Sequence, residues 1–425
     1  FQSSVVVGHN RYSTNTTSSF SRVQPFSILA HNGEINTIEQ LRVEAKQIGA
    51  HITFGNSDSQ DVNITLETLK HKQGYSLKEA MELLFPPVPA EFDSEQEVNT
   101  IYHTIRSAFG PYCQGPAGVL TREGNEFVAS VDALGLRPVW LLETNDYFVF
   151  SSEQGILSPE LFISEPHALS PGEKVGINLL KDGAQLLNHR ELTHFVTTKL
   201  SEKLRMNLAN KQAQLSISVE HSPPSINPYE YGAFGWQKEQ IQLVEQMAEK
   251  GAEPIRSLGH DAPLACLDDG RRNLADYMKE TVAVVTNPAI DRDRETEHFS
   301  TSVLIGKRPS IVNKESGYVL QLPSPILGDG FVGNILKSKR QQIAYEEILN
   351  LYQLENKLHT VHSTFSNLPL EETLSQYKFE AIEAVKNGAE CIIITDEQAH
   401  KENQYWIDPA LITSAIHNGL VNARI

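Results

Sequence analysis

Short apolar runs separated by polar breaks dominate the first 178 residues of the chain. The runs are rich in β-branched and aromatic residues and end at Gly, Asn or Asp, a pattern typical of β-strands joined by turns. The pattern predicts strands over residues 4–8, 26–30, 117–121, 126–131, 139–143, 147–151 and 173–177. Because the first of these begins so close to Phe1, the sequence resembles a segment that begins inside a domain.

The stretches between these strands predict four helices. They cover residues 35–48, 59–71, 76–84 and 95–109. The run Asp58-Ser59-Gln60-Asp61 predicts an N-cap followed by an acidic first turn, which suits the helix dipole. Helices and strands are mixed rather than strictly alternating, which favours an α+β layered arrangement over a βαβ sheet.

The character of the chain changes after residue 198. Residues 199–235 include the Pro-, Ser- and Gly-rich stretch HSPPSINPYEYGAFGW, which predicts a linker or an extended wrapping segment. Residues 236–425 form a second unit, which opens with an amphipathic helix over 238–250 that Gly251 ends. Elements typical of an α/β domain follow near the C-terminus: a helix over 376–387, a strand over 391–395 and a helix over 409–418.

Composition and charge exclude several functional classes. The 425 residues are 40% hydrophobic and 21% charged, as in ordinary globular proteins, and are enough for two or three domains. The net charge of −17, from 53 acidic and 36 basic residues, argues against a nucleic-acid partner. No run of 18 apolar residues occurs and the N-terminus lacks the features of a signal peptide, so we expect no membrane partner.

Three widely spaced cysteines suit a reducing compartment, and we expect a cytoplasmic protein. They are too scattered for a disulfide framework or for a cysteine-ligated iron–sulfur cluster within this chain. Cys266 and Cys391 lie in apolar runs and are predicted as inert core residues, whereas Cys113 is predicted in a loop. No set of His, Cys, Asp and Glu has ligand spacing, so no metal site is predicted.

Three polar segments carry residue types suited to binding an amino acid. In GHNRYSTNT (8–16), Arg11 can clamp a carboxylate, although a surface ion pair would use the same residue. In LAHNGEINT (29–37), Asn32 and Gly33 fit a hairpin turn, but they also offer an amide NH2 and an unhindered backbone N–H to an oxyanion. In FGNSDSQDV (54–62), Asp58 can hold an ammonium group while Ser57 and Ser59 cap a helix, or Asp58 can itself be a plain N-cap.

Together these segments describe a site for a free α-amino acid whose side-chain carbonyl is attacked. Their order and spacing resemble the class II glutamine amidotransferases, in which the nucleophile is an N-terminal cysteine. The combination HNRYSTNT, QPF and LAHNGEINT resembles, more narrowly, the amidotransferase domain of the glutamate synthase large subunit.

Two further stretches extend this resemblance over nearly the whole chain. Residues 114–157 resemble the same domain, with Asp-x-x-Gly-Leu-Arg-Pro at 132–138 and Ser-Ser-Glu at 151–153. Residues 234–295 resemble the glutamate synthase central domain, in particular through TNPAIDRDRE at 286–295.

The resemblance implies a role for each matched site residue. The implied roles are the glutamine carboxylate pocket for Arg11, Thr14 and Asn15, the oxyanion hole for the Asn32 side chain and the Gly33 N–H, and the α-ammonium site for Asp58. Arg137, in the Gly-Leu-Arg-Pro run, is expected to be structural rather than catalytic.

The resemblance also implies a fold and a reaction. Residues 1–198 would be the C-terminal part of an N-terminal-nucleophile-hydrolase-type domain, an incomplete four-layer αββα sandwich of the α+β class; a linker, 199–235, and an α/β central domain, 236–425, would follow. L-Glutamine would be hydrolysed to L-glutamate and ammonia, which would pass to a 2-oxoglutarate-aminating FMN domain outside this chain. No cofactor is expected in this segment. FMN and a [3Fe-4S] cluster are expected in the parent enzyme, with ferredoxin or a small subunit as partner.

One departure from the family bears on activity. The family nucleophile is a cysteine at the mature N-terminus whose own α-amine acts as base, but this chain starts with Phe1 and has no cysteine near its start. Cys113 is internal and has no free α-amine. We therefore expect no nucleophile in this chain and no activity from it alone; an N-terminal Cys segment and the FMN domain would be its partners within the synthase.

Two alternatives stay open. The first is a non-catalytic glutamate synthase-like protein that has lost its nucleophile. The second is another class II amidotransferase, against which the TNP segment and the absence of a Gly-x-x-x-x-Gly-Lys phosphate loop both argue.

Overall fold

The computed structural model forms two compact units, residues 1–211 with 282–323 (unit 1) and residues 212–281 with 324–425 (unit 2). Within them it describes residues 3–10, 16–35, 38–92, 95–204, 228–236, 238–252, 265–267, 274, 291–292, 294–295, 299–312, 318–322, 324–327, 345–354, 356–401, 403–423 and 425. Each unit is described by itself below.

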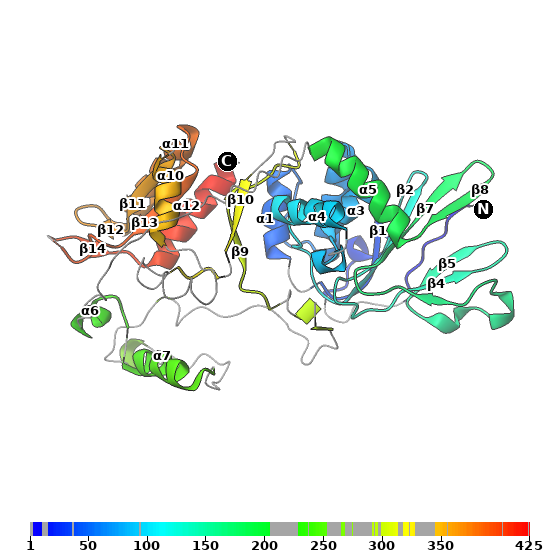
Figure 1. Cartoon of the computed structure of the whole chain (residues 1–425), viewed down its shortest axis with the longest axis horizontal. Helices are drawn as coiled ribbons and strands as arrows, with labels where there is room; N and C mark the ends of the chain where they lie inside the picture. The colour runs from blue at the N-terminus through cyan, green and yellow to red at the C-terminus, as the bar shows by residue number, and fades with distance from the viewer. Residues whose placement is uncertain are drawn as a thin grey trace. The chain divides into compact units, whose positions relative to one another are not determined.

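Two larger antiparallel sheets and a separate two-stranded pair form the β part of the described residues of unit 1 (Figure 1). The larger has the order β1-β2-β3-β7-β8, with bounds Leu29–Gly33, Ala117–Glu123, Glu126–Val131, Lys174–Leu180 and Gly183–Leu187. The smaller has the order β5-β4-β6, with bounds Phe148–Ser151, Trp140–Glu143 and His167–Ala168. A separate hairpin pairs β9, Val303–Lys307, with β10, Tyr318–Leu322.

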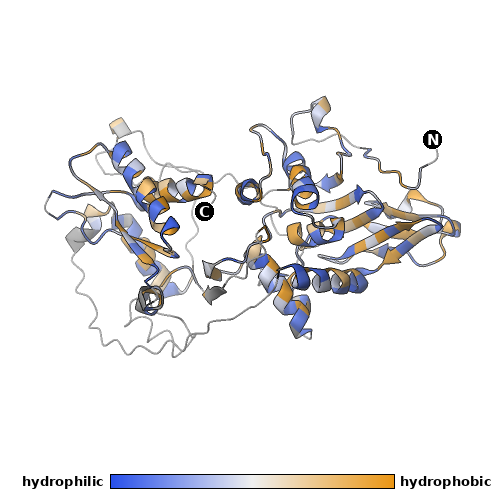
Figure 2. Cartoon of the chain, turned by 90° about the horizontal axis from the view of Figure 1, so that it is seen from above, coloured by the Kyte–Doolittle hydropathy of each residue, from blue (hydrophilic) through white to orange (hydrophobic). Residues whose placement is uncertain are grey.

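Helices cover one face of the larger sheet. They are α1 (Glu39–Gln47), α2 (Asp58–Glu67), α3 (Leu77–Leu84), α4 (Gln96–Ala108) and α5 (His189–Leu204). A short π-helix, Thr68–Lys72, continues α2, and 3-10 helices lie at Phe20–Arg22, Pro89–Phe92, Gln154–Ile156 and Pro159–Leu161. The core of helices α1 to α5 is shared with the helix-facing side chains of the strands, including Leu29, Val119 and Val128. Figure 2 shows how strongly apolar residues concentrate in the strands of this unit.

The smaller sheet packs on the opposite face of the larger one. Side chains of β3 and β7 that point away from the helices, such as Phe127 and Val175, share a second core with Leu141 and Phe150 of the smaller sheet. The rings of Phe127 and Phe150 lie 5.1 Å apart. Because successive strand residues face opposite sides, one sheet can bury both faces. The described residues of unit 1 therefore form three layers: helices, sheet, sheet.

Several predicted elements match the structure, whereas the predicted helix 376–387 begins earlier, at Leu370. Three further differences lie in unit 1 and concern the region of the predicted site. The predicted strand 126–131 coincides with β3, and the predicted strand 391–395 coincides with β13 of unit 2. Residues 4–8 are not a strand, because they have no pairing partner among the described residues; Val5 and Val7 only pack against the second core. Ser57 rather than Asp58 caps α2, through a reciprocal bond with Gln60, so Asp58 is the first helical residue.

The third difference concerns the Asn-Gly step. The predicted strand 26–30 is shifted to residues 29–33, since the Phe26 N–H turns back to the Leu29 carbonyl at 2.8 Å. Asn32 and Gly33 then pair with Gly118 and Ala117 of β2. They are therefore the last two residues of a strand, and the hairpin-turn interpretation is wrong.

Unit 2 contains a parallel strand pair joined through a helix. Strands β11 (Leu358–His362) and β13 (Cys391–Thr395) pair in parallel, with α11 (Leu370–Lys386) between them in the chain. The remaining elements are α6 (Pro228–Ala233), α7 (Lys238–Lys250), a 3-10 turn at Ala265–Leu267, α10 (Tyr345–Leu354), β12 (Thr364–Phe365), β14 (Tyr405–Trp406) and α12 (Pro409–Ala423). Helices α11 and α12 pack around buried Val361, Ala381 and Ile412. Among the residues that the structure describes, no helix is both long and apolar enough to cross a membrane.

The cysteine predictions need one correction. Cys266, predicted in the core, is exposed in its 3-10 turn. Cys391 is half-buried, and burial raises the pKa of its thiol. Cys113 follows a bend in a loop, as predicted, but its side chain is buried in the helix-side core of unit 1.

Candidate active site around Asn32, Gly33 and Asp58

Strand β1 forms one edge of the larger sheet among the described residues. The Arg122 N–H donates to the Ile28 carbonyl at 2.9 Å, and the Glu34 N–H donates to the Pro116 carbonyl at 2.8 Å. In an antiparallel pair, every second residue exchanges bonds with the neighbouring strand. The even-numbered residues of β1 therefore bond to β2, and the N–H groups of the odd-numbered residues point away from the sheet.

Among the described residues, side chains accept hydrogen bonds from two of these outward N–H groups, those of Leu29 and His31, but not from that of Gly33. The Leu29 N–H donates to Asn63 Oδ1 at 3.1 Å, and the His31 N–H donates to Gln24 Oε1 at 2.6 Å. Gly33 is next in this row, and the described residues offer its N–H no acceptor. Since Gly33 is also exposed, its N–H is a donor that a bound substrate can use.

Only glycine fits at position 33. Its φ is +127°, a region that L side chains rarely adopt. A Cβ there would lie 1.8 Å from the Pro116 carbonyl oxygen, which is the same oxygen that accepts from Glu34. The close approach of two backbones thus explains the glycine independently of any turn.

The Asn32 side chain is half-buried and points to the face of the larger sheet that is opposite the helices. Its Nδ2 donates to Ser152 Oγ at 3.4 Å, a long hydrogen bond to the Ser-Ser-Glu run that follows β5. An amide NH2 carries two donors, so one N–H of Asn32 stays available. The carboxyl end of β1 therefore presents an amide side chain and a backbone N–H from adjacent residues.

Asp58 begins helix α2 with one free carboxylate oxygen. Its Oδ1 accepts from the Ser59 N–H at 2.8 Å and from Ser59 Oγ at 3.3 Å. No described residue donates to Oδ2. A negative charge in the first turn is stabilised by the helix dipole, so the site for Asp58 is formed by the helix start itself.

A short hydrogen-bonded path joins Asp58 to the end of β1. Ser59 Oγ, which bonds to Asp58, lies 2.9 Å from Nδ1 of His31, the residue before Asn32. The His31 side chain is only 6% exposed, and His9 Nε2 lies 3.2 Å from its backbone carbonyl. The structure therefore brings the predicted oxyanion residues and the predicted ammonium site onto neighbouring elements.

Two histidines of unit 1, buried His31 and half-buried His189, have lowered pKa values. Burial lowers the pKa of His31, an effect that Asp58 opposes and His9 reinforces. Burial also lowers the pKa of His189, against the nearby charge of Glu82. His189 Nδ1 accepts from the Lys174 N–H at 3.2 Å, a bond that requires the neutral ring.

Unit 1 is expected to lose stability as the pH falls below about 6.5. Both pKa values lie below the ordinary 6.5 in the folded state, so the unfolded chain takes up these protons first. The free energy of unfolding should be flat near pH 8 and then fall by at most about 1.4 kcal/mol per pH unit for each histidine. Urea unfolding at pH 8 and pH 5.5 measures this. His189→Gln should flatten the pH dependence, exposed His71→Gln should not, and an unchanged slope in His189→Gln contradicts the assignment.

Neither Cys113 nor Cys391 has the environment of an activated nucleophile, because burial raises the pKa of both thiols. The Cys113 side chain is 7% exposed, and burial together with the nearby charge of Asp58 raises the pKa of its thiol. A nucleophilic cysteine requires a lowered pKa and access to substrate. Proximity to Asp58 therefore does not make Cys113 a catalytic thiol.

Asp132 is a residue of the site's framework whose role the sequence did not reveal. It is 8% exposed, and its carboxylate accepts backbone N–H groups from its own loop and from β2: those of Leu134, Leu136, Arg137 and Ala117, at 3.1–3.2 Å. Burial raises its pKa, which these hydrogen bonds oppose. Because Ala117 pairs with Gly33, Asp132 fixes the strand against which the Asn-Gly step is set. The Arg137 N–H is one of the donors to Asp132, which agrees with the expected structural role of Arg137.

The remaining predicted site residues, Arg11, Thr14 and Asn15, lie outside the described residues, as do Asn36 and Thr37 of the HNGEINT run. Their roles stay predictions. Among the described residues, no group of three His, Cys, Asp or Glu side chains is arranged to hold a metal ion.

Comparisons with known proteins identify both halves of the chain. Residues 1–201 match the class-II glutamine amidotransferases, and residues 230–425 match the glutamate synthase central domain. The chain is 29% identical, over its whole length, to a ferredoxin-dependent glutamate synthase 2 of Synechocystis, and 28% identical to a glutamate synthase [NADPH] large chain of Azospirillum brasilense. The aligned regions cover 28% and 29% of those relatives, so the chain spans less than a third of their length.

Among solved structures, a glutamine phosphoribosylpyrophosphate amidotransferase from Bacillus subtilis aligns with 43% of this chain and 34% of its own, at 21% identity and a TM-score of 0.28. That score is too low to indicate a shared fold. The sequence matches, by contrast, cover both halves of the chain in the order in which they occur in the curated relatives. The chain therefore belongs to the glutamate synthase family, with a class II glutamine amidotransferase region followed by a glutamate synthase central domain.

Proposed function

We propose that the chain supplies the glutamine site of a glutamate synthase, where L-glutamine is hydrolysed to L-glutamate and ammonia. The observation that carries this proposal is the end of β1, where the Gly33 N–H faces away from the sheet beside the Asn32 amide. Two such donors suit the oxyanion that forms when a side-chain amide is attacked. The path through Ser59 and His31 connects them to the carboxylate of Asp58.

In this proposal the Asn32 side-chain amide and the Gly33 N–H donate hydrogen bonds to the carbonyl oxygen of the glutamine side-chain amide. A nucleophile gives up its proton and adds to the carbon, and the oxygen becomes negatively charged. When this adduct collapses, the nitrogen takes up the proton, the C–N bond breaks and ammonia leaves, after which water hydrolyses the glutamyl group from the nucleophile to give L-glutamate. Each oxyanion donor is worth about 3–4 kcal/mol where such donors have been removed from other enzymes. The nucleophile would be a cysteine at the mature N-terminus, as in the family.

The α-carbon end of glutamine would be held by charge. The free Oδ2 of Asp58 would accept from the α-ammonium group, and Arg11 would pair with the α-carboxylate, with Thr14 and Asn15 lining that pocket. Opposite charges at fixed positions select an L-amino acid and place its side-chain amide at the oxyanion donors.

The rest of the enzyme follows from the family. We propose a domain division at residues 198 and 236, a four-layer αββα arrangement for the complete amidotransferase domain, and a cytoplasmic location. Ammonia would pass to a 2-oxoglutarate-aminating FMN domain outside this chain, which would carry FMN and a [3Fe-4S] cluster, with ferredoxin or a second subunit supplying electrons. The relatives include a ferredoxin-dependent glutamate synthase and a glutamate synthase [NADPH] large chain.

Substitution of Asp58 by Asn in the natural full-length protein tests the proposal. We expect the KM for glutamine to rise by about 10- to 100-fold, because a charge-assisted hydrogen bond worth about 1.5–3 kcal/mol is lost. Glutamate formation from ammonia should stay within about twofold of the natural rate. The matched control is Asp146→Asn, which changes an exposed carboxylate in the β4–β5 turn. An unchanged KM for glutamine in Asp58→Asn would refute the role of Asp58.

A further inference from the structure

Arg294 of the TNPAIDRDRE run is anchored in unit 1, among residues far away in sequence. Its Nε donates to the Ala133 carbonyl at 3.0 Å and its Nη2 donates to the Pro171 carbonyl at 3.2 Å. The same guanidinium forms ion pairs with Glu91 and with Asp291, the latter at 2.6 Å. With its side chain only 14% exposed, Arg294 clamps two loops of the amidotransferase region.

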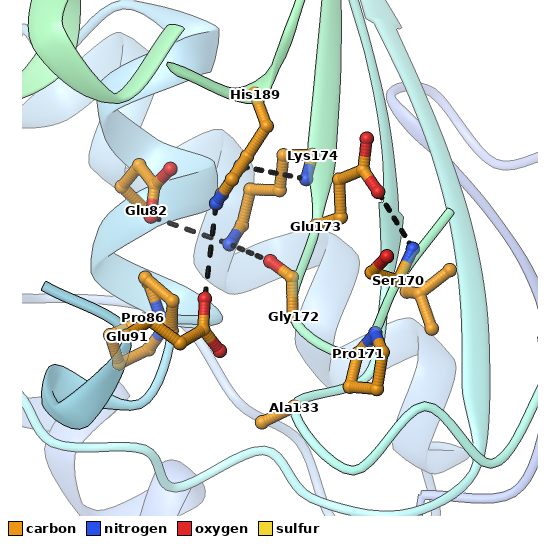
Figure 3. A network of polar contacts seen from close by, with 12 residues as sticks. Glu82, Pro86, Glu91, Ala133, Ser170, Pro171, Gly172, Glu173, Lys174 and His189 are labelled. Carbon is orange, nitrogen blue, oxygen red and sulfur yellow. Dashed lines mark hydrogen bonds and ion pairs between the residues drawn. The ribbon is translucent and has the colours of Figure 1, made fainter. Parts of the chain in front are cut away.

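The acidic partner of this clamp, Glu91, lies at the edge of a polar network whose inner members, Glu82 and Lys174, are buried. Figure 3 shows Glu91 facing His189, at 4.0 Å, and Lys174 between Glu82 and the Gly172 carbonyl, at 3.3 Å from each. Burial raises the pKa of Glu91, and Arg294 opposes this rise. Arg294, together with Lys174, therefore stabilises a carboxylate that burial disfavours.

The two clamped carbonyls flank the Asp132 loop. Ala133 follows Asp132 in the chain, and Gly172, next to Pro171, donates its N–H to the Asp132 carbonyl at 2.9 Å. Asp132 in turn bonds to Ala117 through both its carboxylate, at 3.1 Å, and its N–H, at 2.9 Å. Ala117 pairs directly with Gly33, and the missing Cβ of Gly33 would overlap the carbonyl of Pro116, the residue before Ala117.

We propose that Arg294 is a positioning residue for the oxyanion donors. By holding the Ala133 and Pro171 carbonyls, it fixes the Asp132 loop, the start of β2, and with it the orientation of the Gly33 N–H. A residue of the central-domain match thus sets the geometry of the glutamine site, and this inference rests on the proposed function. Small displacements matter there, because a misplacement of about 1 Å can cost about 100-fold in rate.

Arg308 provides a matched control within the same unit. Its Nε and Nη2 donate to the carbonyls of Ser107 and Ala108 at 3.0 and 2.9 Å, and its Nη1 pairs with Glu44 at 2.8 Å. It therefore resembles Arg294 in charge and in bonding two backbone carbonyls and a carboxylate, whereas its side chain is more exposed, at 40% against 14%. Its contacts lie at the end of α4 and on α1, and it bonds to no described residue of the Asp132 loop.

The test compares Arg294→Ala, Arg294→Lys and Arg308→Ala in the natural full-length protein. We expect Arg294→Ala to lower kcat for glutamine hydrolysis by about 10- to 100-fold with KM within about twofold, while Arg308→Ala lowers the melting temperature but keeps kcat. Arg294→Lys should lie between, because one ammonium cannot bond both carbonyls as a guanidinium does. Hydrogen exchange at residues 31–34 should accelerate in the Arg294 variants and not in Arg308→Ala.

Two results would overturn this inference. One is a natural kcat in Arg294→Ala; the other is an equal loss of kcat in Arg308→Ala, which would indicate a general structural effect. If Arg294→Ala does not fold, Arg294→Lys decides by the same two readouts. If glutamine hydrolysis depends on Asp58 but kcat does not change in the Arg294 variants, only the role of Arg294 is refuted. A natural protein without glutamine hydrolysis would refute the proposed function itself.

Discussion

A Gly33→Ala variant is expected to lose both the geometry of the β1–β2 pair and the hydrolysis of glutamine. The added Cβ would stand 1.8 Å from the Pro116 carbonyl oxygen, so one of the two strands must move. Backbone strain at φ +127° and forced repacking together predict a loss of about 2–6 kcal/mol in unfolding free energy. Since the Gly33 N–H is the proposed oxyanion donor, glutamine turnover should fall by at least about 100-fold.

Urea unfolding and glutamine hydrolysis by the natural full-length protein measure these two effects. The matched control is Gly124→Ala in the β2–β3 turn, where φ is also positive, at +58°, but a Cβ would meet no atom within 4 Å. That variant should lose about 1–2 kcal/mol and keep its turnover. If Gly33→Ala were no less stable than Gly124→Ala, the close backbone approach at position 33 would be wrong.

An Asn32→Ala variant is expected to fold normally and to hydrolyse glutamine about 100- to 1,000-fold more slowly, the effect of removing one oxyanion donor. Its structural cost is small, because Asn32 is half-buried and its bond to Ser152 is long, at 3.4 Å. The loss should appear in kcat, since the oxyanion exists only after attack on the amide.

Ser152→Ala separates the donor from its support. It removes the acceptor that holds Asn32 but leaves the amide NH2 in place, so we expect a loss of less than about 10-fold. Steady-state kinetics with glutamine give both values. A Ser152→Ala variant as impaired as Asn32→Ala would show that the amide contributes orientation of the sheets rather than a donor to the substrate.

Local sequence patterns were sufficient where one face of an element is buried. Strand β3 was predicted at its observed bounds because apolar residues fill it between Gly124-Asn125 and Asp132, and both of its faces are covered by layers. Helix α7 was predicted at its observed bounds because Gly251, at φ +61°, ends an amphipathic run. Helix α5 was missed, although Leu192, Val196 and Leu200 repeat at helical spacing and are buried.

Contacts between distant residues lay beyond local patterns. The Asn-Gly step suggested a hairpin because the sequence does not show that Pro116 closes on Gly33 from 83 positions away. The sequence predicted no role for Asp132 of the Asp-x-x-Gly-Leu-Arg-Pro run. The backbone groups that it bonds become its neighbours only when the loop folds against β2. The ion pair of Arg294 with Glu91 joins residues 203 positions apart. In the candidate site, the residue types were predictable, whereas the framework that orients them was not.

The most direct measurement of the central claim is the ratio of glutamine-dependent to ammonia-dependent glutamate formation in the Asn32→Ala full-length protein. Ammonia bypasses the step that Asn32 is proposed to serve, so both rates can be read from one preparation. The proposed function predicts that the ratio falls by at least about 100-fold, with the ammonia-dependent rate within about twofold of the natural enzyme. An unchanged ratio, or an equal loss of both rates, would contradict an oxyanion site at Asn32 and Gly33.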